Sequence, residues 1–122
     1  MTLKELYENI GADYDQALRV LRIDRLLNKH IQRFPKNDAV SRLVACKDTM
    51  DATELFESAH AIKGLCANLG LTVMSDKAAV IADEFRAGNA RSMSDDEVKA
   101  LIDEIDALYQ KTVQGIMDYI NS

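Results

Sequence analysis

The chain has few of the residues that favour β-sheets, disulfide frameworks and irregular loops. Its 122 residues include no Trp, one Pro, five Gly and two Cys, with only four Tyr and three Phe. So few aromatic residues argue against aromatic-rich strands, and so few Pro and Gly leave helices largely uninterrupted. Cys46 and Cys66 lie far apart without a Cys-x-x-Cys spacing, so we expect two buried, reduced thiols and no disulfide or ligand role.

Motifs for several common activities are also absent. No Gly-rich phosphate-binding loop occurs, so we expect neither ATP binding nor kinase activity of the chain's own. The net charge is −5 with Lys and Arg spread among the acids, which gives no basic stripe for nucleic acid. No run is apolar enough to cross a membrane, and the charged start at Met1 to Glu5 differs from a signal peptide. We therefore expect a cytoplasmic protein that binds neither nucleic acid nor membrane. We also expect a monomer, because packing within one chain accounts for its long C-terminal apolar stripe.

The apolar residues that are present recur at helical spacing, which predicts an all-α protein. With 48% apolar residues, the chain suits one domain spanning residues 1–122 and leaves no room for a second catalytic domain. Helix starts are expected at residues that cap the free N–H groups of a first turn, namely Thr2, Asp13, Asp51 and Ser94. Helix ends are expected near Gly11, Pro35, Gly70 and Gly88.

Two further helix starts follow from the pattern of charges and turns. A single helix through residues 13–34 would place the Asp24 carboxylate in its apolar face, which is costly. We therefore expect a break at residues 22–23, with Asp24 as the next cap. Thr72 is expected to cap the following segment, whose helical pattern continues to Gly88.

The most informative stretch runs from Ala59 to Gly70, in a helix predicted to start near Asp51. Its core stripe consists of Leu55, Ala59, Ile62, Cys66 and Leu69. At about 100° per residue, His60 projects roughly 140° away from that stripe. Lys63 and Gly64 lie within about 60° of His60 on the same outer face. A nucleophile, a cation and a residue without a side chain therefore share one exposed surface.

These three residue types suit phosphoryl transfer between proteins. A lone exposed His is ordinarily only a surface residue, so the inference depends on its neighbours. Neutral imidazole can attack phosphorus near pH 7, and Lys63 can compensate charge on the transferring group. Gly64 leaves room for a partner to approach, which gives a reason for the roughly 1 kcal/mol that Gly costs relative to Ala inside a helix.

The run Ala59-His60-Ala61-Ile62-Lys63-Gly64-Leu65-Cys66-Ala67-Asn68-Leu69-Gly70 resembles the signature of histidine-containing phosphotransfer (HPt) domains. The similarity extends more loosely from the 24–34 segment to the C-terminal helix. It implies an antiparallel four-helix bundle with one or two short N-terminal helices packed across it. It also implies a phosphorelay role in two-component signalling, in which His60 accepts a phosphoryl group from a receiver-domain aspartyl phosphate and transfers it to another receiver aspartate.

The resemblance further implies partners, cofactors and supporting residues. The partners would be response-regulator receiver domains, of a hybrid histidine kinase and of a downstream regulator. The chain would need no cofactor or metal of its own, with magnesium on the partner receiver. Glu57 could orient the imidazole from one turn away, and Phe56 and Ala67 could give apolar docking contact. On the facing helix, Ala82 stands where many members have Gln, which leaves Lys77 and Asp83 as polar alternatives.

Two other hypotheses use the same residues. The first is a catalytically silent helical adaptor that binds receivers or other signalling proteins through the same face, although the intact His-x-x-Lys-Gly argues against it. The second is a metal or haem bundle that uses His30, His60, Cys46 and Cys66, although their spacings match no usual ligand pattern. His30 has no companion motif, so we interpret it as a surface residue.

Overall fold

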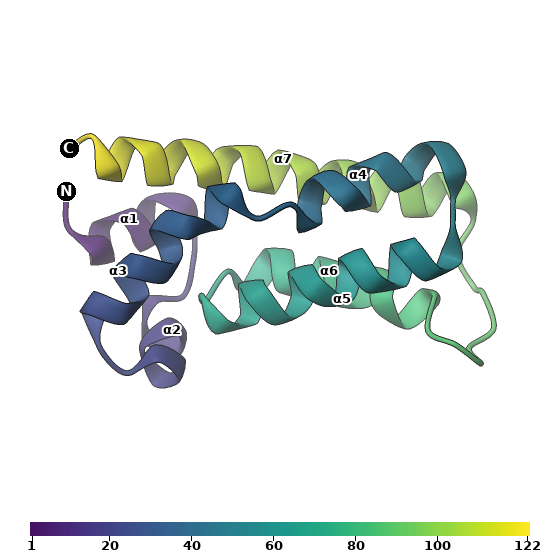
Figure 1. Cartoon of the computed structure of the whole chain (residues 1–122), viewed down its shortest axis with the longest axis horizontal. Coiled ribbons are helices and arrows are strands. Elements are labelled where there is room, and N and C mark those ends of the chain that lie inside the picture. Colours follow the sequence, from purple (N-terminus) through teal and green to yellow (C-terminus); the bar gives the residue numbers. More distant parts are fainter.

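The computed structural model describes residues 1–122, and all of its regular structure is helical. Figure 1 shows four helices, α4 to α7, in an antiparallel bundle, with α1, α2 and α3 gathered at one end. The α-helices are α1 Leu3–Ile10, α2 Tyr14–Leu21, α3 Asp24–Arg33, α4 Ala39–Thr49, α5 Ala52–Asn68, α6 Thr72–Glu84 and α7 Asp95–Ile120, and a 3₁₀ turn, η1, spans Phe34–Lys36. The all-α helical bundle predicted from the sequence is therefore confirmed.

The order of the helices around the bundle determines which faces are free. Helix α5 packs against α4 on one side and α6 on the other, and α7 closes the bundle between α4 and α6. Helices α5 and α7 are therefore diagonal to each other. The short α2 packs on α5, whereas α1 packs on α7. The outer face of α5 is consequently exposed along the middle of the bundle.

Four of the predicted caps form the expected hydrogen bonds. The side chains of Thr2, Asp13, Asp51 and Ser94 each accept a backbone N–H three residues on, at 2.9–3.1 Å. Each bond satisfies a donor that the first turn of a helix would otherwise leave free. These residues fix the starts of α1, α2, α5 and α7 at the predicted positions.

Two predicted caps are wrong by one residue. The break at residues 22–23 occurs, with Arg22 at φ 74°, but Ile23 is the residue that precedes α3, and Asp24 lies inside the first turn. The Asp24 carboxylate instead accepts a hydrogen bond from the Tyr14 hydroxyl. Likewise Leu71 precedes α6, and Thr72 is its first residue. In both cases the helix begins without a side-chain cap.

Two helix ends depend on contacts with other parts of the chain. Gly70 follows α5 at φ 71°, and a Cβ there would overlap the Asp13 carbonyl oxygen. Helix α6 ends at Glu84, four residues before the predicted Gly88. The buried Glu84 carboxylate accepts the N–H groups of Ser92 at 2.9 Å and Met93 at 2.6 Å, which folds the loop back against the end of the helix.

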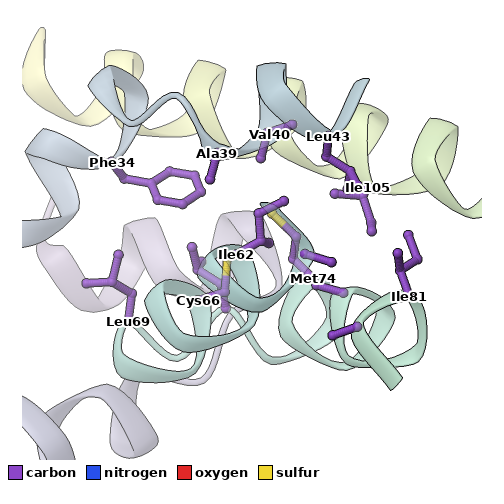
Figure 2. Close-up of a cluster of buried hydrophobic side chains, with 14 of the residues drawn as sticks. Phe34, Ala39, Val40, Leu43, Ile62, Cys66, Leu69, Met74, Ile81 and Ile105 are labelled. Carbon is purple, nitrogen blue, oxygen red and sulfur yellow. The ribbon is translucent and has the colours of Figure 1, made fainter. Parts of the chain in front are cut away.

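The core contains 26 buried apolar residues and extends from the space between the four bundle helices to α1, α2 and α3. Figure 2 shows side chains from η1, α4, α5, α6 and α7 meeting there, including Phe34, Leu43, Ile62, Ile81 and Ile105. Cys46 and Cys66 are both buried and unpaired, as predicted. Burial raises the pKa of the Cys66 thiol to about 12 because the thiolate would lose its hydration. None of the helices combines the length and the apolar composition that crossing a bilayer requires.

Candidate functional site

His60 lies on the exposed face of α5, about midway along the helix. The predicted stripe of Leu55, Ala59, Ile62 and Cys66 is buried in the bundle, whereas His60 is exposed. Because these four residues fix the rotation of α5 about its own axis, the imidazole must project outward. The predicted orientation of His60 is therefore confirmed.

Lys63 lies on the same face, one turn beyond His60. Its side chain is half-buried and forms no ion pair within the chain. The backbone there is held to α6, since the Ser75 hydroxyl donates a hydrogen bond to the Lys63 carbonyl oxygen at 2.9 Å. The ammonium group therefore remains available for an anion at the surface of α5.

Gly64 is open to solvent on the side where a side chain would stand. A Cβ built there would meet no atom of the protein within 4 Å. Gly115 in α7 gives the contrast, because a Cβ at that position would overlap Cγ2 of Ile10 in α1. Packing inside the protein thus explains why residue 115 is a glycine, but it does not explain why residue 64 is one. The space beside His60 is free for another molecule.

Phe56 stacks on the imidazole from one turn earlier in α5. The two ring centroids are 5.5 Å apart, and the ring planes differ by 13°. Phe56 is half-buried and packed against the core, so its position is fixed more firmly than that of the exposed histidine. One face of the His60 ring is consequently covered. From the sequence we expected Phe56 only as an apolar docking contact, although its spacing of four residues from His60 on a helix could have indicated the stack.

Glu57 faces away toward α4. Its carboxylate lies 3.9 Å from the Arg42 guanidinium, which also pairs with Glu54 at 2.8 Å. No hydrogen bond joins Glu57 to His60 in the structure, and its orienting role stays a prediction that must compete with Arg42. Ala67, two turns beyond His60, is half-buried, and its docking role stays a prediction.

The polar alternatives on the facing helix also have other partners. Lys77 pairs with Glu104 of α7 at 3.2 Å, and Asp83 pairs with Arg86 at 2.7 Å. Ala82 is fully buried. Neither Lys77 nor Asp83 forms a hydrogen bond or ion pair with His60, whereas Phe56 stacks on its ring.

The surroundings of His60 form an open face. The four main surface hollows are lined by other residues, and the largest of them, about 360 Å³, lies between α1 and α2. A small substrate would normally be enclosed in a concave pocket. The chain contains no group of three or more His, Cys, Asp or Glu side chains arranged to hold a metal ion. The face around His60 thus suits a reacting group that another protein presents.

Comparison with known proteins identifies the family. The Hpt domain family matches residues 3–111, which include α1 to α6 and the first part of α7. No curated protein and no solved structure gave a match. Since the match extends over most of the 122 residues, the chain belongs to the Hpt domain family, which acts in phosphotransfer within phosphorelay signalling.

Proposed function

We propose that His60 is the phosphoacceptor of a phosphorelay intermediate. It takes a phosphoryl group from the aspartyl phosphate of one receiver domain and transfers it to the aspartate of another. The observation that carries this proposal is the open face of α5. An exposed imidazole lies there beside an unpaired Lys63 and beside Gly64, where an added Cβ would meet no protein atom within 4 Å. Receiver domains of response regulators and kinases are the usual partners of Hpt domains.

The proposed transfer exchanges one phosphorus bond for another. A ring nitrogen of neutral His60 donates its lone pair to phosphorus, and a new N–P bond forms. The P–O bond to the receiver aspartate breaks, and its electron pair remains on the carboxylate that leaves. In the second half of the relay the carboxylate of the other receiver attacks the phosphohistidine, and the imidazole is restored. No water enters either step.

The neighbouring residues support these steps in different ways. The stack with Phe56 limits rotation of the imidazole and so reduces the orientations that a docked receiver must select. Lys63 compensates the negative charge that develops on the phosphoryl oxygens. Magnesium would be bound by the acidic site of the partner receiver and would supply further charge compensation there. Gly64 allows the partner's backbone to approach within contact distance.

The docking interface is expected to be small, because a relay must release one receiver before it binds the next. Phe56 and Ala67 would provide its apolar contacts. One partner would be the receiver of a hybrid histidine kinase, and the other the receiver of a downstream regulator. The proposal also places the protein in the cytoplasm as a monomer, with no kinase activity of its own.

The test reconstitutes the relay from purified parts. A receiver carrying radioactive aspartyl phosphate is mixed with the protein, and a second receiver is then added. We expect an acid-labile, alkali-stable label on the protein that later passes to the second receiver. His60→Gln should abolish the label and its onward transfer. His30→Gln should retain them, because the residue four positions after His30 is the buried Phe34 and not an open glycine.

Two results would contradict the proposal. Label that persists in His60→Gln would assign the phosphoacceptor to another residue. Receiver binding without any label on the wild-type protein would instead indicate the silent adaptor.

A further inference from the structure

The positive charges of the chain are concentrated in one segment, contrary to the even distribution inferred from the sequence. Residues 19–36 contain six of the 15 Lys and Arg but one of the 20 Asp and Glu. This segment includes the end of α2, all of α3 and η1. We call its six cationic side chains the basic surface: Arg19, Arg22, Arg25, Lys29, Arg33 and Lys36. A count of charge in short windows would have revealed it.

The basic surface is exposed and unneutralised. All six residues are exposed, and none forms an ion pair within the chain. Asp24, the one acid among them, is hydrogen-bonded by the Tyr14 hydroxyl. On α3, Arg25, Lys29 and Arg33 follow at four-residue steps and form one stripe. With six cations and one carboxylate, the segment carries a net positive charge and produces a positive field at this end of an otherwise acidic protein.

Three exposed apolar residues lie among these charges. Val20, Ile23 and Leu26 are 41%, 46% and 37% exposed. The main apolar face of α3, with Leu27 and Ile31, is already buried in the protein, so the helix has no free apolar face to insert into a lipid surface. Apart from His30, the exposed residues of this segment include no aromatic ring on which a nucleic-acid base could stack. Cations interspersed with a few aliphatic contacts fit an acidic protein surface best.

The basic surface lies beside the face that carries His60. Figure 1 shows α2 and α3 at the end of the bundle where α5 finishes. A hollow of about 190 Å³ joins the two regions, with His30 and Arg33 on one side and Leu65 and Asn68 of α5 on the other. Asn68 is eight residues beyond His60, or about 12 Å along the helix. A protein that covers about 800 Å² around His60 would therefore reach the basic surface.

We propose that the basic surface docks the acidic rim of the receiver domain that exchanges a phosphoryl group with His60. This inference rests on the proposed function, and it adds the location and sign of the contact that brings the two proteins together. The carboxylates and phosphoryl group of a phosphorylated receiver are attracted to the six cations, which raises the association rate. Val20, Ile23 and Leu26 then provide short-range contact.

The experiment compares two double variants with the same change of charge. Arg25→Glu/Lys29→Glu reverses two charges in the basic surface. Lys99→Glu/Lys111→Glu reverses two on α7, which is diagonal to α5 and whose lysines form no ion pairs. For each protein, kcat/KM is measured for transfer from a phosphorylated receiver that loads wild-type His60, across a range of salt concentrations. Circular dichroism verifies that the variants fold.

A second arm removes the receiver from the reaction. The small donor phosphoramidate transfers its phosphoryl group directly to histidine: a ring nitrogen binds phosphorus, the donor P–N bond breaks, and ammonia leaves. We expect the basic-surface variant to lose about 10-fold or more in kcat/KM at low salt, with a weaker salt dependence than wild type. It should react with phosphoramidate at the wild-type rate, and the α7 variant should resemble wild type in both assays.

Several outcomes would overturn this inference without affecting the phosphoacceptor assignment. Equal losses of kcat/KM in both double variants would mean that only the net charge of the protein affects transfer. Unchanged kcat/KM in the basic-surface variant would show that receivers dock elsewhere. Binding of wild type to anionic vesicles or to DNA that the same variant abolishes, with receiver transfer intact, would assign the surface to a different class of partner. Label on His60→Gln would instead overturn the proposed function itself.

Discussion

Replacing Gly64 by Ala should make the protein more stable and a worse phosphotransfer partner. Gly in a helix interior costs about 0.8–1.0 kcal/mol relative to Ala. Because a Cβ at Gly64 would meet no protein atom within 4 Å, no steric penalty offsets this gain. The free energy of unfolding should therefore rise by about 1 kcal/mol, which corresponds to about 3–5 °C in Tm for a chain of this size.

The same methyl group would stand where the receiver must approach His60. A displacement of about 1 Å between the reacting atoms can reduce a transfer rate by about 100-fold, so we expect a loss of about 10- to 100-fold in single-turnover transfer. Stability is measured by thermal and urea unfolding, and transfer by rapid mixing with a phosphorylated receiver.

Gly115→Ala provides the matched control. Its Cβ would overlap Ile10, so it should destabilise the protein by about 1–3 kcal/mol while leaving transfer unchanged at temperatures where the protein is folded. Two results would refute the reasoning. Loss of stability in Gly64→Ala would mean that the space beside His60 is not free. A gain in stability with unimpaired transfer would mean that the partner does not approach that side of α5.

Three further predictions concern Lys63, Phe56 and Glu84. Lys63→Gln should slow transfer by about 10- to 100-fold, which corresponds to the loss of a hydrogen bond to a charged group, and should leave the free energy of unfolding unchanged. A single-turnover rate equal to that of wild type would exclude charge compensation by this lysine. Phe56→Leu should move the His60 ring-proton resonances downfield, because the stacked ring no longer shields them, and should lower kcat more than it raises KM. A rise in KM alone would assign Phe56 to docking only. Hydrogen bonds from the Met93 and Ser92 N–H groups hold the pKa of Glu84 below its usual value of 4.5. The ionised carboxylate therefore stabilises the fold above pH 4.5, and this stabilisation is lost as the pH falls through the lowered pKa. In urea unfolding, Glu84→Gln should be less stable than wild type at pH 7, with a difference that shrinks in acid; a difference independent of pH would contradict this role.

The sequence was sufficient to predict the rotation of α5 and hence the exposure of His60. Both depend on local properties, namely a buried stripe at helical spacing and a cap at Asp51 that starts the helix in the right place. The positive φ of Gly70 also follows from its position after the last residue of the stripe, although its contact with Asp13 could not be predicted locally. Patterns of this kind can be read from neighbouring residues because the interactions that enforce them span one or two turns.

Features that depend on contacts between distant residues could not be predicted in this way. Glu57 was one candidate for orienting His60, and the sequence could not show that Arg42 from another helix lies 3.9 Å from its carboxylate. Helix α6 was expected to continue to Gly88, but Glu84 accepts hydrogen bonds from a loop that returns to it. Asp is a residue type that often caps helices, but the Asp24 carboxylate instead accepts a hydrogen bond from the Tyr14 hydroxyl of the preceding helix. In each case a tertiary partner competes with the local preference and changes the outcome.

The most direct test identifies the residue that carries the phosphoryl group. The protein is loaded from a phosphorylated receiver and examined by ³¹P NMR at alkaline pH, where phosphohistidine is stable, together with His60→Gln and His30→Gln. We predict one phosphohistidine resonance in wild type and in His30→Gln, and none in His60→Gln. A resonance that remains in His60→Gln, or that disappears only in His30→Gln, would contradict the assignment of His60 as the phosphoacceptor.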